Sequence, residues 1–162
     1  MRSLIAARIV LLDSDQARRD ALTAALAEFA AFEVESIATV AEVPSVAWTA
    51  PDVFIVEGPS RAANEEAGSI SSNPFLASGI PTILLLPAAT NEQRRRAIKA
   101  GYSVVLGAPV PPRLLYRRIA HLMQVTRRAK RRMAQAVTES TKPRVIEIAP
   151  AEPAPRAKVP AH

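Results

Sequence analysis

Short apolar runs, each followed by a turn or an acidic residue, recur along the first two thirds of the chain. Runs of this length are typical of strands that are buried on both faces of a parallel sheet. The pattern predicts such strands over residues 8–13, 52–57, 81–86 and 103–106. Residues 32–37 instead alternate apolar residues with Glu33 and Glu35, which predicts an edge strand with one face in water.

Helical patterns lie between the strands. Residues 16–29 carry apolar side chains at helical spacing, and Asp15 is placed to cap this helix. The apolar face comprises Ala17, Ala21, Leu22, Ala25, Leu26 and Phe29, with Arg18, Arg19 and Asp20 off that face. Thr90 and Gln93 have the form of a capping box, and Gly101 suits the end of that helix. Weaker patterns predict a short helix from Thr39, one over 61–72, and a last helix from Arg113.

Strands that alternate with helices in this way predict an α/β class domain with a doubly wound, five-stranded parallel sheet. We expect this domain to span residues 1–125, followed by a basic extension of the last helix over 126–137. Residues 138–162 are rich in proline and alanine, which predicts a disordered tail.

Composition excludes several kinds of site. The chain of 162 residues has no cysteine and two histidines, which excludes disulfides, thiolate metal sites and His-rich metal sites. No apolar run is long enough to span a membrane and no secretory signal is evident, so we expect a cytoplasmic protein. The net charge of +6 is concentrated in the second half of the chain, where it can attract an acidic partner.

Two predicted strands end on carboxylates. Asp13 follows the first strand, and Glu57 ends the strand that begins at Asp52. In open parallel sheets, ligands gather outside the carboxyl ends of the strands. Glu57 is therefore either a reactive group or the remnant of one.

The order of these segments resembles the receiver domain of two-component response regulators, and the resemblance covers about residues 7–125. It rests on five motifs: residues 9–15 (IVLLDSD), 51–57 (PDVFIVE), 80–86 (IPTILLL), 100–102 (AGY) and 108–110 (APV) followed by Arg113-Leu114-Leu115. The resemblance implies a flavodoxin-like fold with strand order 2-1-3-4-5. It also implies a protein partner such as a histidine kinase or another signalling protein.

The residues that carry receiver chemistry are mostly replaced in this chain. The resemblance places the phosphoacceptor at Glu57 and the paired acids at Asp13 and Ser14, so one metal ligand is lost. It places the switch hydroxyl at Leu86, the phosphate-binding lysine at Ala108 and the switch aromatic at Val105. We therefore expect no catalytic residues and no cofactor. Asp13 and Glu57 are weak candidates for binding Mg²⁺.

Glu57 admits two interpretations. Its longer side chain could mimic a permanently phosphorylated state, because its charge projects toward the place of an acyl phosphate. The residues that would sense that charge are lost, however, and a change of state requires a differential contact. We favour a solvated or water-bridged acid left in a decayed pocket.

The resemblance makes the fourth helix, fifth strand and fifth helix the face that meets partners or a second protomer. This face carries Arg94, Arg95, Lys99, Val105, Arg117 and Arg118. His121 follows on the last helix, and we expect it to be a partly buried structural residue. Nucleic-acid binding is not favoured, because the basic extension lacks aromatic residues that could stack on bases.

These observations favour a stand-alone, non-catalytic regulatory module that binds proteins in two-component signalling. Two alternatives stay open. One is a phosphorylatable regulator that uses Asp13 and a metal in an unusual pocket. The other is a regulator that binds nucleic acid through its basic tail.

Overall fold

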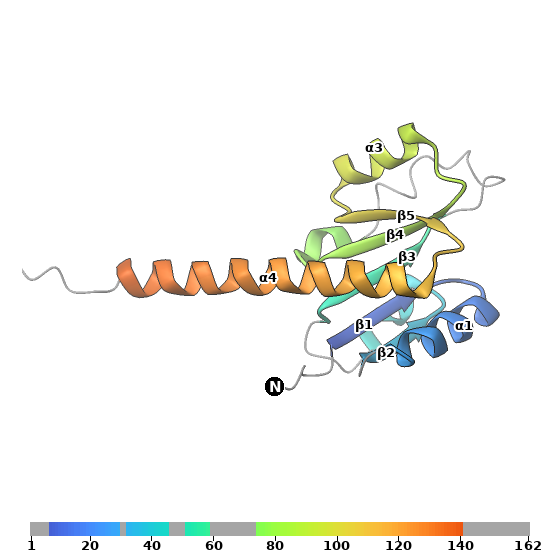
Figure 1. Cartoon of the computed structure of the whole chain (residues 1–162), viewed down its shortest axis with the longest axis horizontal. Coiled ribbons are helices and arrows are strands. Elements are labelled where there is room, and N and C mark those ends of the chain that lie inside the picture. The colour runs from blue at the N-terminus through green and yellow to red at the C-terminus, as the bar shows by residue number, and fades with distance from the viewer. Residues whose placement is uncertain (1–6, 30–31, 46–50, 59–73, 141–162) are drawn as a thin grey trace, which may run out of the picture.

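The computed structural model describes residues 7–29, 32–45, 51–58 and 74–140 (Figure 1). Five parallel strands form one sheet in the order β2-β1-β3-β4-β5. The predicted fold is confirmed, with β2 at one edge. The strands are β1 (Ala7–Leu12), β2 (Phe32–Ile37), β3 (Val53–Glu57), β4 (Thr82–Pro87) and β5 (Val104–Ala108). The helices are α1 (Gln16–Ala27), α3 (Asn91–Ala100) and α4 (Pro112–Ser140), with 3₁₀ helices η1 (Val40–Ser45) and η3 (Pro74–Ser78).

The helices cover both faces of the sheet, because successive side chains of each buried strand point to opposite faces. On one face, residues such as Ile9 and Ile55 pack against α1 and α4. On the other face, Val10 and Phe54 pack against η3 and α3. Phe75 stacks on Phe54 with a ring-centroid separation of 4.1 Å, and this contact attaches η3 to the sheet.

The caps of α1 and α3 follow the sequence. The Asp15 side chain accepts a hydrogen bond from the Arg18 backbone N–H at 3.0 Å. Thr90 and Gln93 form the predicted capping box, and Gly101 ends α3 with a φ of 112°. These local interactions fix where both helices begin and where α3 ends, independently of the packing of the core.

Two boundaries differ from the prediction. Strand β5 continues to Ala108 because Gly107 and Ala108 pair with Leu86 and Pro87 of β4. The short helix predicted after Thr39 is confirmed as a 3₁₀ helix, since Pro44 lacks the N–H that a longer α-helix needs there. Helix α4 runs without a break to Ser140, three residues beyond the predicted end of the extension. The helix predicted over residues 61–72 and nearly all of the tail lie outside the described residues.

The buried side of α1 is rotated relative to the predicted apolar face. Leu26 is fully buried and Leu22 is half-buried, as predicted, but Ala17 and Ala21 are exposed. Arg19, which the pattern left on the outer face, is only 8% exposed. An alanine contributes too little apolar area to fix the rotation of a helix, so the two leucines and Arg19 determine it.

Gly58 follows β3 where the backbone runs close to β4. Its N–H donates to the Leu85 carbonyl at 2.7 Å, and an added Cβ would lie 2.3 Å from Leu86 Cδ2. We expect Gly58→Ala to lower the free energy of unfolding by about 1 to 3 kcal/mol, because the buried Leu86 would have to move. Urea unfolding would measure this change. Gly79→Ala is the comparison variant, because Gly79 has a positive φ but an added Cβ there would meet no atom within 4 Å. An unchanged midpoint for Gly58→Ala would contradict the expectation.

Among the described residues, no helix is both long enough and apolar enough to cross a membrane.

Candidate acid cluster at the carboxyl edge of the sheet

Asp13 and Glu57 come together at the carboxyl edge of the sheet. Asp13 directly follows β1, and Glu57 is the last residue of β3. These two strands are adjacent, because Leu12 of β1 pairs with Val56 of β3. The Asp13 and Glu57 side chains are only 7% and 11% exposed. The interpretation of Glu57 as a solvated acid is therefore wrong, because burial in the angle between two strand ends removes most of its contact with water.

Arg18 of α1 lies between the two acids and was not singled out from the sequence. Its Nε and Nη2 donate to the two carboxylate oxygens of Asp13 at 3.0 and 2.9 Å. The same Nη2 lies 2.8 Å from Glu57 Oε2 in an ion pair. Its Nη1 lies 3.8 Å from Asp15 Oδ2. One guanidinium thus bridges the acids of β1 and β3. We define Asp13, Arg18 and Glu57 as the acid cluster.

A signal for Arg18 exists in the sequence. It occupies the first turn of a helix, where the helix dipole favours anions over cations. A cation in that place implies a nearby negative charge, and Asp13 lies five residues earlier. The choice of Arg18 over its neighbour Arg19 could not be made, because it depends on the rotation of α1.

Arg19 fixes the turn that carries Asp13. Its Nη1 donates to the Asp13 carbonyl at 2.6 Å, and its Nη2 donates to Gln16 Oε1 at 3.2 Å. The Asp15 N–H donates to Asp13 Oδ1 at 2.8 Å. Side chain and backbone of Asp13 are therefore held from three directions, so the acid cluster is preorganised.

The two carboxyl groups differ in their acidity. Burial and the neighbouring Asp13 carboxylate raise the pKa of Glu57 to about 7, against the opposing charge of Arg18. Burial also disfavours the Asp13 anion, but hydrogen bonds from Arg18, Glu57 and Asp15 outweigh it and lower the pKa of Asp13 to about 2. The hydrogen bond with Asp13 raises the pKa of Arg18. At neutral pH the cluster therefore holds Asp13 as an anion, while Glu57 is partly protonated.

The other residues predicted for this pocket offer no polar contact to it. Ser14 is exposed beside the cluster, and Leu86 is 1% exposed within the apolar core below Gly58. Ala108 is half-buried and precedes Pro109 in a cis peptide bond. None of these three places a charge or a hydroxyl group next to Glu57.

The cluster does not fit Mg²⁺. A hard divalent cation needs several free oxygen ligands, but both oxygens of Asp13 and Oε2 of Glu57 already contact the Arg18 guanidinium. Within the described part of the chain, no group of three or more acidic or histidine side chains is arranged to hold a metal ion.

An apolar groove of about 250 Å³ opens beside the cluster. It lies between α1 and the loop that joins β5 to α4, with Asp13, Arg18 and Glu57 at its polar end. Its apolar lining consists of Ala21, Leu22, Ala25, Leu85, Ala108, Pro109, Val110 and Pro112. Ala21, Leu22 and Ala25 of α1 therefore form one wall of this groove.

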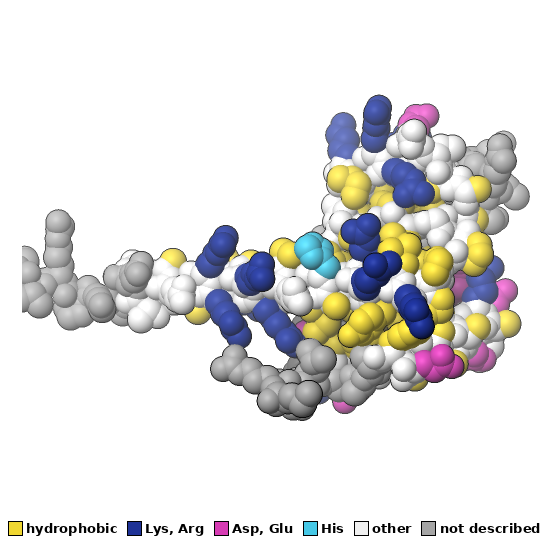
Figure 2. All heavy atoms as spheres, in the orientation of Figure 1, with side chains coloured by type: hydrophobic (Ala, Val, Ile, Leu, Met, Phe, Trp, Pro, Cys, Tyr) yellow, Lys and Arg dark blue, Asp and Glu magenta, His cyan; other side chains and the backbone are white. Residues whose placement is uncertain are grey.

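The predicted partner-binding face is partly accessible. Arg95, Lys99, Arg117 and Arg118 are exposed, and Figure 2 shows basic side chains over α3 and along α4 on the same side of the molecule. Two members of the predicted set are corrected. Val105 is buried at 9% exposure, and the Arg94 guanidinium donates to the Val105 carbonyl at 3.2 Å, which ties α3 to β5. His121 was predicted to be partly buried but is exposed on the outer side of α4.

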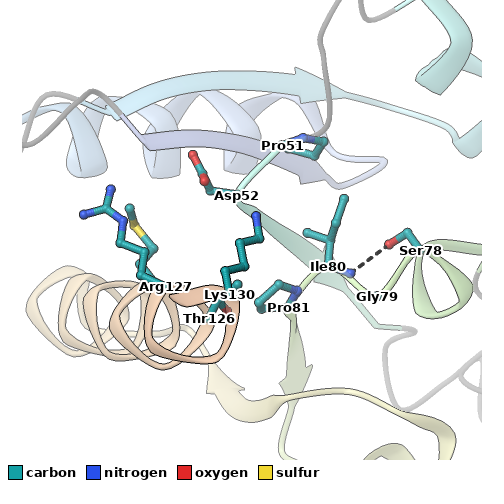
Figure 3. Close-up of a pocket in the computed structure, with 10 residues that line it drawn as sticks. Pro51, Asp52, Ser78, Gly79, Ile80, Pro81, Thr126, Arg127 and Lys130 are labelled. Atoms are coloured by element: carbon teal, nitrogen blue, oxygen red, sulfur yellow. Dashed lines mark hydrogen bonds between the residues drawn. The ribbon is translucent and has the colours of Figure 1, made fainter. Parts of the chain in front are cut away.

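A second recess, of about 210 Å³, lies at the opposite edge of the sheet. Its walls are the residues before β3 and β4, which include Asp52 and Pro81, and one side of α4 (Figure 3). The Arg127 and Lys130 side chains extend from α4 toward Asp52, whose Oδ2 accepts a hydrogen bond from the Arg8 backbone N–H at 3.0 Å. This recess was not predicted, because it forms only where α4 leaves the sheet.

Comparisons with known proteins find similarity of structure rather than of sequence. No family model and no curated protein sequence matches the chain. A response regulator receiver domain protein (CheY-like) of Methanospirillum hungatei has a TM-score of 0.60 at 24% identity, over 76% of this chain and 98% of its own. A response regulator of Desulfuromonas acetoxidans has a TM-score of 0.57 at 25% identity, over 74% and 98%.

A third solved structure, of a Burkholderia pseudomallei protein described as related to pilus assembly, has a TM-score of 0.59 at 20% identity, over 73% and 90%. The resemblance that the sequence motifs indicated is thus confirmed at the level of the fold. Residues 7–125, so far as the structure describes them, have the fold of response-regulator receiver domains.

Proposed function

We propose that the chain is a non-catalytic receiver-fold module that binds proteins in signal transduction and does not undergo phosphorylation. The observation that carries this proposal is the position of Arg18 between Asp13 and Glu57. Where the resemblance implies a metal ion beside these acids, the guanidinium of Arg18 contacts both of them. It supplies a fixed positive charge to the acids, but no open coordination sites for a phosphodonor.

The chemistry of phosphoryl transfer supports this reading. Transfer to a carboxylate needs an ionised nucleophile with a free oxygen, and cations that offset the charge on the transferred group. Glu57 has a raised pKa, and its Oε2 is engaged with Arg18. The half-buried Ala108 offers no second cation. The charges of the acid cluster are therefore balanced within the cluster. Few free oxygen atoms and no free cation are left there to bind an incoming phosphoryl group.

A role as a phosphorylated-state mimic gains no support from this geometry. The charge of Glu57 is balanced by Arg18, and Leu86 is packed in the core with no polar atom to sense it. We infer that the cluster fixes the fold in one state. The protein then acts through surfaces such as the accessible basic residues on α3 and α4, with a histidine kinase or another signalling protein as the class of partner.

Phosphoryl labelling tests the proposal. We expect no gain of a phosphoryl group in the intact mass of the full chain after incubation with acetyl phosphate and Mg²⁺. A receiver domain that retains the paired acids and the phosphoacceptor aspartate serves as positive control. Partner capture from native cells should also be insensitive to the donor. Labelling of Asp13 or Glu57 would overturn the proposal and favour the phosphorylatable alternative.

The similarity to a pilus-related protein leaves open which process the partner serves. A captured partner that belongs to a phosphorelay would link the chain to two-component signalling. If the captured partner belongs to a surface-assembly machine, the chain is still a non-catalytic binding module, but it acts in that process instead of two-component signalling.

A further inference from the structure

Helix α4 extends well beyond the sheet that its first turns cover (Figure 1). Its 29 residues correspond to a length of about 44 Å. Leu115, Ile119 and Met123 are buried against the sheet, whereas every residue from Arg127 to Thr138 is exposed. The second half of α4 is therefore a helix with no contact to the core of the described domain.

The side of α4 that packs on the sheet continues along this projecting half. Met123, Thr126, Lys130, Met133 and Val137 follow one another at alternating steps of three and four residues, which places them on one side of the helix. Met133 and Val137 are 70% and 67% exposed. We call Thr126, Lys130, Met133 and Val137 the seam. Spacing of this kind is typical of a helix surface that packs against another helix.

The charge around the seam is of one sign. The projecting half carries five cations and no acid before Glu139. The cations are Arg127, Arg128, Lys130, Arg131 and Arg132, none of which forms an ion pair with an acid of the described residues. Lys130 lies in the middle of the seam, and a charged seam position favours a partner helix that offers the opposite charge there.

The seam begins at the recess near Asp52. Met123, Thr126, Arg127 and Lys130 form the α4 wall of that recess, and Figure 3 shows the Lys130 amino group directed into it. A partner that lies along the seam therefore meets the end of the sheet at this point. The docking surface is continuous from the recess to Val137.

We propose that the projecting half of α4 binds an acidic amphipathic helix of a partner protein, laid along the seam. The partner would place apolar side chains on Met133 and Val137 and carboxylates around Lys130 and its flanking arginines. This proposal goes beyond the function proposed above, because it names the partner's chemistry and a surface distinct from the acid cluster.

Other occupants fit less well. A second copy of the chain would bring two acid-free basic helices together, with Lys130 inside the contact. An anionic membrane favours Leu, Phe or Trp on the apolar side of a helix, and the seam has only a methionine and a valine. Nucleic acid would use the charges but gains nothing from an apolar seam, and the projecting half has no aromatic residue to stack on bases.

The test uses the full chain and a designed, fluorescent helical peptide of about 20 residues with one leucine stripe and glutamate elsewhere. We expect saturable binding by fluorescence anisotropy, weakened at least about fivefold in a Met133→Gln, Val137→Gln double variant. Lys130→Glu should weaken it about tenfold. Ile98→Gln, at an exposed apolar position of α3, is the matched control and should leave binding unchanged.

Three comparisons identify the occupant. The same assay uses a mixed-sequence DNA duplex, vesicles that contain anionic lipid, and a lysine version of the peptide. Tighter binding to the duplex or the vesicles, or equal binding of the double variant, would overturn the proposal. The proposal would also be overturned if the chain did not bind the peptide but formed a concentration-dependent dimer in sedimentation that the seam variants disrupted. Phosphoryl labelling does not depend on α4, so failure here is distinct from failure of the proposed function.

Discussion

Replacing Arg18 by methionine is expected to lower the free energy of unfolding by about 2 to 3 kcal/mol at about pH 8. Methionine keeps an aliphatic stem but leaves the buried Asp13 and Glu57 side chains without their shared cation. Removal of one partner from a buried ion pair commonly costs about 3 to 5 kcal/mol. The Arg18 side chain is itself 54% exposed, so solvent screening reduces the loss below that range.

Urea unfolding followed by circular dichroism measures this loss. The matched control is Arg96→Met, because Arg96 forms an ion pair with Glu92 in which the two side chains are 59% and 73% exposed. That variant should differ from the wild type by no more than about 0.5 kcal/mol. Adding Glu57→Gln to Arg18→Met should recover more than half of the loss, because the amide can donate to Asp13 in place of Arg18. Equal losses for Arg18→Met and Arg96→Met would show that the cluster is not a buried ion-pair network.

Stability is expected to fall by about 2 to 3 kcal/mol as the pH rises from about 4.5 to about 7. Glu57 has a pKa of about 7 in the folded chain and an ordinary value of 4.5. Between these values the folded chain binds more protons than the unfolded chain, so raising the pH favours unfolding. The protonated Glu57 donates to the Asp13 carboxylate, and its ionisation replaces that hydrogen bond by repulsion.

Asp13 acts in the opposite sense at lower pH. Its pKa is about 2 in the folded chain against an ordinary 3.8, so its contribution is present above about pH 4 and is lost as the pH falls toward 2. We therefore expect maximal stability near pH 4 to 4.5. Unfolding curves across this range for the wild type and Glu57→Gln provide the measurement. The variant should lack the decline toward neutral pH, and the same slope in both proteins would refute the role of Glu57.

The predictable part of the fold depends on local signals. Apolar runs such as Val53–Val56 are long enough to require burial on both faces, and the caps at Asp15, Thr90 and Gly101 are satisfied within a few residues of the chain. These features predicted the elements and their order. The apolar face of α1 was predicted correctly at Leu22, Ala25, Leu26 and Phe29 but wrongly at its first turns, where the burial of Arg19 depends on its partners in the tertiary structure.

Two of the three residues of the acid cluster were predictable. Asp13 and Glu57 were identified because parallel strands bring their carboxyl ends to one edge. Arg18 was missed, since a side chain of that length reaches many places and only the rotation of α1 selects one. The position of Arg18 changed the interpretation of Glu57 from a solvated remnant to one member of a buried ion-pair network.

The sequence by itself determined the receiver-like fold and the basic character of the last helix. These follow from periodicity and residue type, which act locally. Only the tertiary structure decided that a guanidinium links the two acids, that Val105 is buried with Arg94 bonded to its carbonyl, and that α4 carries an exposed seam beyond the sheet. Each of these depends on distances between elements remote in the chain, and such distances are fixed by packing.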